Sequence, residues 1–196
     1  MWRELQLSAV VTLISWIGSY GQSMSSKLPV ARLQVFTVSS SEHGRTNFDD
    51  LKAELRTQTT VWLELPAFLP YGDVEHPIAA SVVAAGPDGY EIALGWGEDC
   101  FEKDLPGGAG ACHYGSIEAS VKGFQKGATR TPVELRRGMH GYFEHFTCGA
   151  HCGDASLEWN QNGCYYRISL KAGSKNELIR VAESAIAQGR SETRRH

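Results

Sequence analysis

Hydrophobic and polar residues alternate along much of the chain beyond residue 60, and this pattern predicts strands rather than long helices. Apolar runs cover residues 79–85 and 90–96, and the sequence Gly-Pro-Asp-Gly between them is typical of a tight turn. Residues 114–124 and 138–148 have the same character, and Val61, Leu63 and Leu65 alternate before them. The expected strands follow one another with short connections, which favours antiparallel pairing.

The segment 148–170 contains the strongest hairpin signal. Asn162-Gly163 suits a type I′ turn, because both central positions of that turn need a positive φ. A two-residue turn there pairs Gln161 with Cys164, Trp159 with Tyr166 and Leu157 with Ile168. The residues expected on the core side are Leu157, Trp159, Cys164, Tyr166, Ile168 and Leu170. The residues expected on the solvent-exposed side are Ser156, Glu158, Asn160, Arg167 and Ser169.

Two segments have a helical period. Residues 48–56 follow Asn47 as a candidate cap, and Phe48, Leu51 and Leu55 share one face. Near the end of the chain, Ser174 and Glu177 have the spacing of a capping box. The apolar stripe after them consists of Leu178, Val181, Ala182, Ala185 and Ile186, with Gly189 as the expected end. The sequence therefore predicts an α+β fold, in which an antiparallel sheet packs against an N-terminal and a C-terminal helix.

The beginning of the chain resembles a secretory signal peptide. Residues 5–18 are mostly apolar but too short and too interrupted to match the roughly 20 residues of a bilayer-spanning helix, and small residues follow. An uncleaved anchor and an ordinary buried helix remain alternatives. We expect a signal peptide at residues 1–23, a linker at 24–45 with a short strand at 31–38, one domain at 46–189 and a polar tail at 190–196.

Composition narrows the class of protein. Of the 196 residues, 42% are hydrophobic and 21% are charged, which is typical of a globular domain, and the net charge is −3. Only the tail has a basic cluster, at Arg190, Arg194 and Arg195. Because nucleic-acid binding needs a larger basic surface, we expect no nucleic-acid partner.

The chain has five cysteines, which allow about 15 connectivities with two disulfide bonds. Cys100 and Cys112 bracket a loop without an apolar core, and Cys148 and Cys152 are separated by Gly149, Ala150 and His151. Cys164 falls on the core side of the hairpin. We therefore expect structural disulfides Cys100–Cys112 and Cys148–Cys152 and a buried free thiol at Cys164, in an oxidising compartment.

The cysteines, histidines and loop carboxylates also allow a metal site or a catalytic site to be considered. Cys148, His151 and Cys152, completed by His140, His145 or Cys164, could bind a metal, but their spacing matches no common zinc motif. A nucleophilic cysteine lacks an identifiable orienting acid. The carboxylates at Glu98, Asp99, Glu102 and Asp104 lack the alternation of a calcium loop, and the glycines at 107, 108 and 110 do not precede a helix. The tryptophans at 62, 96 and 159 are expected in the core. We therefore predict no catalytic, metal or cofactor site.

Three motifs, "LPAFLP", "LEWNQNGCYYRISL" and "ELIRVAESAIAQG", resemble a bacterial extracytoplasmic domain of unknown function that is attached to anti-sigma-like and sporulation membrane proteins. The matching residues are Trp159, Gly163, Tyr166, Ala182, Glu183 and Ser184. The resemblance covers residues 60–188 and implies a curved sheet on helices, reminiscent of lipoprotein carriers, without enzyme activity. The loop at 100–112 and the pair Cys148/Cys152 depart from the family pattern.

These observations predict a secreted or periplasmic, non-enzymatic domain that binds an unknown protein or small ligand and has no stable membrane insertion after processing. The alternative is a metal- or lipid-binding carrier that uses a Cys/His cluster or a cavity between sheet and helix. A hydrolase or redox enzyme is a third possibility. Sequence alone identifies neither the partner nor the oligomeric state.

Overall fold

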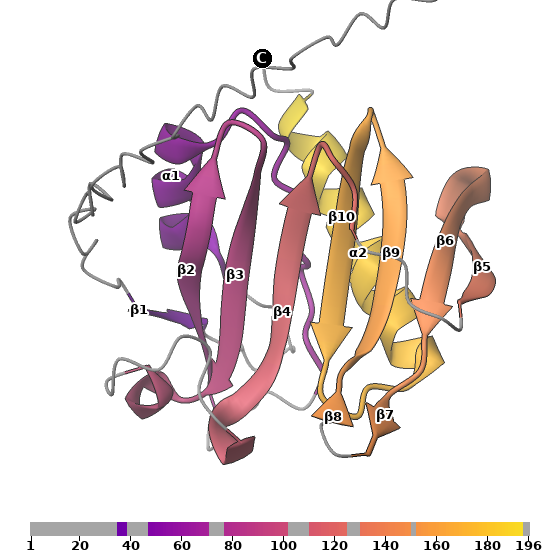
Figure 1. Cartoon of the computed structure of the whole chain (residues 1–196). Coiled ribbons are helices and arrows are strands. Elements are labelled where there is room, and N and C mark those ends of the chain that lie inside the picture. The colour runs from indigo at the N-terminus through magenta and orange to yellow at the C-terminus, as the bar shows by residue number, and fades with distance from the viewer. Residues whose placement is uncertain are drawn as a thin grey trace, which may run out of the picture. The chain divides into compact units, whose positions relative to one another are not determined.

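A single antiparallel sheet dominates the computed structural model, which describes residues 35–38, 47–70, 77–101, 110–124, 130–149 and 152–193. The expected signal peptide and most of the expected linker lie outside these residues. Within them, eight strands pair in the order β1-β2-β3-β4-β10-β9-β6-β5 (Figure 1). The strands are β1 (Val35–Val38), β2 (Ile78–Gly86), β3 (Gly89–Trp96), β4 (His113–Ser120), β5 (Thr131–Leu135), β6 (Met139–Glu144), β9 (Ala155–Gln161) and β10 (Cys164–Leu170).

Two helices, three 3₁₀ turns and a small ribbon complete the described structure. The helices are α1 (Asp49–Gln58) and α2 (Lys175–Thr193), and three single 3₁₀ turns are η1 (Glu98–Cys100), η2 (Gly110–Cys112) and η3 (Arg136–Gly138). A separate two-stranded ribbon consists of β7 (Thr147–Cys148) and β8 (Cys152–Gly153). The α+β class with a mostly antiparallel sheet is therefore confirmed.

The hydrophobic core lies between the sheet and the two helices. Leu51 and Leu55 of α1 and Leu178 and Val181 of α2 belong to the same buried cluster as the inward-facing residues of the strands. Figure 1 shows both helices behind the sheet, on the side away from the viewer. The sheet is not strongly curled (Figure 1), so the curved sheet that the family resemblance implies is not found.

The predicted hairpin is confirmed in turn and register. Asn162 and Gly163 have φ values of 54° and 79°, as a type I′ turn requires. Trp159 pairs with Tyr166, and their rings stack with centroids 5.5 Å apart. A local turn signal was therefore sufficient to fix which residues of β9 and β10 face the core.

The start of α2 agrees with the sequence, whereas α1 begins one residue later than expected, with Phe48 rather than Asn47 as its N-cap. The backbone N–H of Asp49 donates to Oδ1 of Asn47 at 2.9 Å, at the start of α1. At the start of α2, the N–H of Ser174 donates to the carboxylate of Glu177 at 2.8 Å, and the N–H of Glu177 donates to Oγ of Ser174 at 3.3 Å. The reciprocal pair is the predicted capping box.

Several expectations were wrong. Trp62 is 50% exposed, because the alternation that buries Val61 and Leu63 directs the residue between them to the opposite side. Residues 61–65 do not form a strand. The expected strand at residues 114–124 ends earlier, at Ser120, and Val121 lies in the turn after β4 and is 44% exposed. Gly189 does not end α2, which continues to Thr193, and β5 was not anticipated.

Candidate binding face of the sheet

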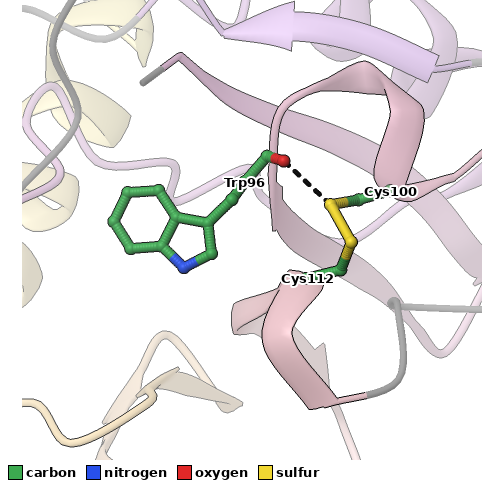
Figure 2. The surroundings of a disulfide bond; sticks show 3 residues. All are labelled: Trp96, Cys100 and Cys112. Carbon is green, nitrogen blue, oxygen red and sulfur yellow. Dashed lines mark hydrogen bonds between the residues drawn. A yellow bond between two sulfur atoms is a disulfide. The ribbon is translucent and has the colours of Figure 1, made fainter. Parts of the chain in front are cut away.

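Cys100 and Cys112 lie at disulfide-bonding distance, with Cα atoms 5.3 Å apart. Cys100 is buried with Phe101 in a small satellite cluster beside the sheet. Figure 2 shows that Sγ of Cys100 also lies against the carbonyl oxygen of Trp96, at 2.8 Å. A disulfide sulfur has no proton to donate, so this contact is one of packing. The pair joins the end of β3 to the start of β4, on either side of residues 102–109.

Cys148 and Cys152 form the second pair at disulfide-bonding distance, with Cα atoms 4.0 Å apart. They are directly opposed in the ribbon of β7 and β8, and both are exposed. The residue between them that the metal hypothesis needs, His151, lies outside the described residues. Two such pairs favour an oxidising environment, in which cross-links persist.

Cys164 is 5% exposed and belongs to the main core cluster. Burial raises the pKa of its thiol, and the hydrogen bond with Tyr166 lowers that pKa by less. A thiol that is buried and protonated is a poor nucleophile. Cys164 therefore acts as a small apolar residue of the core.

The remaining polar candidates do not assemble into a metal centre. His140 is exposed on β6, and the ring of His145 packs edge-on against Phe143 at 4.6 Å between centroids. Nε2 of His113 lies 2.6 Å from Oδ2 of Asp154, a pair that fixes the start of β4 against the start of β9. Across the ranges that the structure describes, no three His, Cys, Asp or Glu side chains are grouped to hold a metal. Neither described helix is long and apolar enough to cross a membrane.

A row of charged side chains crosses the sheet on the face opposite the helices, which we call the open face. Glu91 lies opposite Glu118, and Glu118 lies opposite Arg167. Arg167 lies opposite Glu158, and Glu158 lies opposite Tyr142. The row therefore runs through five neighbouring strands: β3, β4, β10, β9 and β6. In Figure 1 this face is turned toward the viewer, and neither α1 nor α2 covers it.

One end of the row is neutralised by arginines. Glu158 accepts from Nη2 of Arg130 at 2.6 Å and from Nη2 of Arg167 at 3.2 Å. Each guanidinium also stacks on an aromatic ring, Arg130 on Tyr142 at 5.0 Å and Arg167 on Phe124 at 4.0 Å. These contacts make this end rigid and compensate its charge.

The other end of the row is compensated less: Arg167 lies opposite Glu118, but its ion pair is with Glu158. In the described part of the chain, neither Glu91 nor Glu118 takes part in an ion pair, whereas Asp88 nearby pairs with Lys122 at 2.8 Å. Oγ of Ser116 donates to Glu118 at 3.1 Å. Carboxylates that are directly opposed across two strands repel each other.

A groove of about 450 Å³ opens at this acidic end. Its lining includes Glu91, Glu118, Lys122, Phe124 and the β2–β3 turn at Pro87. Burial raises the pKa of Glu118, and the charges of Glu91 and Glu158 raise it further, against a lowering by Arg167 and Ser116. The carboxylate of Glu118 is therefore poorly stabilised by the protein itself, and an added positive charge would stabilise it.

Exposed apolar side chains lie along the open face as well. Tyr142 is 48% exposed and Tyr165 is 36% exposed. Tyr165 lies opposite Ser120, which lines the groove, and its ring contacts the position of Gly123. The open face thus combines aromatic contact area with fixed charges, a composition typical of recognition surfaces.

The sequence pattern predicted the part of this site on β9 and β10, but not the part on β3 and β4. The hairpin pattern placed Glu158 and Arg167 on the solvent side. Glu158 lies on that face but is only 7% exposed, with two guanidinium groups against it. The pattern gave no reason to connect the two residues with Glu91 or Glu118. Those contacts depend on the pairing of β3 with β4 and of β4 with β10, for which the segments carry no local signal. The only indication in the sequence was that successive predicted strands each carry a charged residue on the outward-facing side.

We compared the chain with protein-family models, with curated proteins and with solved structures. None of the three comparisons gave a match.

Proposed function

We propose that this chain is an extracytoplasmic, non-enzymatic domain that binds a partner through the open face of its sheet. The observation that carries the proposal is the combination, on one face, of exposed Tyr142 and Tyr165 with the charged row from Glu91 to Glu158. Tyrosines next to arginines and carboxylates give large contact area together with directional contacts.

The compartment is part of the same proposal. The two cysteine pairs at disulfide-bonding distance favour an oxidising environment. We propose that residues 1–23 direct export and that the mature protein is secreted or periplasmic. Membership of the extracytoplasmic family that the motifs resemble is also a proposal, supported by those motifs alone.

The carrier alternative has less support. The space between the sheet and the helices is occupied by buried side chains such as Phe143, Trp159 and Tyr166. The groove at the acidic end lies instead on the open face, where its walls are strand residues and a turn. We therefore favour surface recognition over carriage of a ligand in the interior.

A displayed library of random peptides tests the proposal on the oxidised full chain. We expect selected peptides to bind with micromolar affinity and to lose about tenfold or more in affinity on the double variant Tyr142→Ser/Tyr165→Ser. Trp62→Ser is the matched control, because it removes an exposed aromatic residue outside the sheet. Peptides that bind all three proteins equally would contradict the proposal, provided that near-UV circular dichroism shows the variants to be folded.

A further inference from the structure

The acidic end of the open face has a local charge excess. Asp88 and Lys122 pair with each other at 2.8 Å. Glu158 is held by two guanidinium groups. Glu91 and Glu118 remain as two opposed carboxylates at the groove, and neither forms an ion pair in the described part of the chain. The described lining of the groove has three carboxylates, Asp88, Glu91 and Glu118, against one lysine, Lys122. Arg167, opposite Glu118, offsets part of this charge. A cation is complementary to the negative charge that remains among these residues.

The walls of the groove also have an apolar part. Phe124, one side of which stacks with Arg167, and Ala84, which lies opposite Glu91, line it together with the two carboxylates. A long aliphatic side chain with a charged end fits such a surface, because its methylene groups cover apolar atoms while the charge reaches the polar groups. A lone metal ion would use neither Phe124 nor Ala84.

The surroundings of the groove favour a polypeptide over a free amine. Tyr165 lies opposite Ser120, a residue of the groove lining, and Val121 next to it is 44% exposed. Apolar area thus continues beyond the groove, where the residues that flank a basic side chain in a polypeptide would make contact.

We infer that the groove binds a lysine or arginine side chain of a partner polypeptide, with its cationic group next to Glu91 and Glu118. This inference rests on the proposed function, because it specifies what the open face recognises. Partner segments are expected to have a basic residue flanked by apolar residues. Arg167, already engaged by Glu158 and Phe124, holds β10 in place beside the groove.

The same peptide selection tests the inference. We expect selected peptides to be enriched in lysine and arginine. Isothermal titration calorimetry should give about tenfold or more weaker binding to Glu91→Gln/Glu118→Gln. Glu134→Gln is the control for loss of a single carboxylate, because Glu134 is an exposed carboxylate of the edge strand β5 and lies outside the groove lining. Its affinity should change by less than about twofold.

The outcomes separate this inference from the proposed function. Peptides without lysine or arginine, or binding unaffected by Glu91→Gln/Glu118→Gln, would overturn the inference. If Tyr142→Ser/Tyr165→Ser still weakened that binding, the proposed function would stand. Acetyl-lysine-amide and acetyl-arginine-amide are the probes for a free side chain. If either bound as tightly as the peptides, a small amine would replace the polypeptide as the ligand.

Self-association is the remaining outcome. The tail of this chain carries Arg190, Arg194 and Arg195, so a second copy could supply the basic residue. Sedimentation velocity on the full chain distinguishes this case. A dimer that dissociates in Glu91→Gln/Glu118→Gln would overturn the inference of a separate partner, whereas a monomer in both proteins supports it.

Discussion

Glu91 on β3 and Glu118 on β4 lie directly opposite each other on the open face of the sheet. Burial raises the pKa of Glu118, and the charge of Glu91 adds to this effect. Both carboxylates line the groove. A cation bound there would relieve the repulsion between them.

The first prediction concerns the stability of Glu118→Gln. A carboxyl group with a raised pKa stabilises the folded state fully below its unfolded pKa, and this contribution is lost as the pH rises through the folded pKa. Glutamine cannot ionise. The variant should therefore be more stable than the wild type at pH 7, by about 0.5 kcal/mol, and equally stable below about pH 4. Urea unfolding at both pH values measures this, with Glu134→Gln as the control. A variant that is less stable at pH 7 would contradict the assignment.

The second prediction concerns Gly189 in α2. A Cβ at this position would overlap the carboxylate of Glu64, which is 2% exposed and accepts a hydrogen bond from Nε2 of Gln161 at 2.9 Å. Glycine to alanine in a helix normally stabilises by about 1 kcal/mol. Here Gly189→Ala should destabilise, by about 1–3 kcal/mol, because a buried, hydrogen-bonded polar group must move.

A double-mutant cycle isolates the cause of that effect. If the carboxylate of Glu64 is what the new methyl group displaces, the effects of Glu64→Ala and Gly189→Ala should not add, and the coupling should be about 1 kcal/mol or more. A stabilising Gly189→Ala, or strictly additive effects, would show that the two residues do not crowd each other.

The third prediction concerns alkaline pH. Burial raises the pKa values of Tyr90 and Tyr166 above that of free tyrosine. The unfolded chain therefore ionises first, and stability present below about pH 10 should fall above it, by up to about 1.4 kcal/mol per pH unit for each tyrosine. The hydroxyl of Tyr166 donates to the carbonyl oxygen of Trp62 at 3.2 Å. Tyr166→Phe should lower stability at pH 8 and make the alkaline decline less steep.

Urea unfolding between pH 8 and pH 11 measures this slope. The measurement is best made in a Cys164→Ala background, because the thiolate of an unfolded chain would attack the disulfides. An identical slope with and without Tyr166 would contradict the prediction.

The fourth prediction concerns the cysteines. Denatured, unreduced protein should contain one reactive thiol, because Cys164 is outside both pairs. Cys100→Ala/Cys112→Ala should cost about 3 kcal/mol and Cys148→Ala/Cys152→Ala about 2 kcal/mol, on the chain-entropy estimate for loops of these lengths. Removal of the second pair should leave the main sheet folded, because β7 and β8 form a separate ribbon. Three or more reactive thiols would contradict the pairing.

Features with a local cause were predictable from the sequence. Asn162-Gly163 fixed the turn, and the turn fixed the register from Leu157 to Ile168. The capping box at Ser174 and the apolar stripe of α2 depend on spacings of three and four residues. Residues a few positions apart in the sequence determine such features, so they can be predicted without knowing which distant segments are in contact.

Features with a distant cause were not predictable. Gly189 resembles a helix end, but its actual role is to leave space for Glu64, which is far away in the sequence. The alternation of Val61 and Leu63 placed Trp62 outward, and only the general tendency of tryptophan to be buried suggested otherwise. The charged row required the order of strands in the sheet. No local sequence pattern predicts that β10 lies between β4 and β9.

The most direct test of the proposed binding face is the change in amide chemical shifts of the isotope-labelled full chain when a selected peptide is added. The account predicts that the largest changes cluster at the groove and along the outward-facing positions of β3, β4 and β10, around Glu91, Glu118 and Tyr165. Changes that instead cluster on α1, α2 or residues 59–70, with the open face unperturbed, would contradict it.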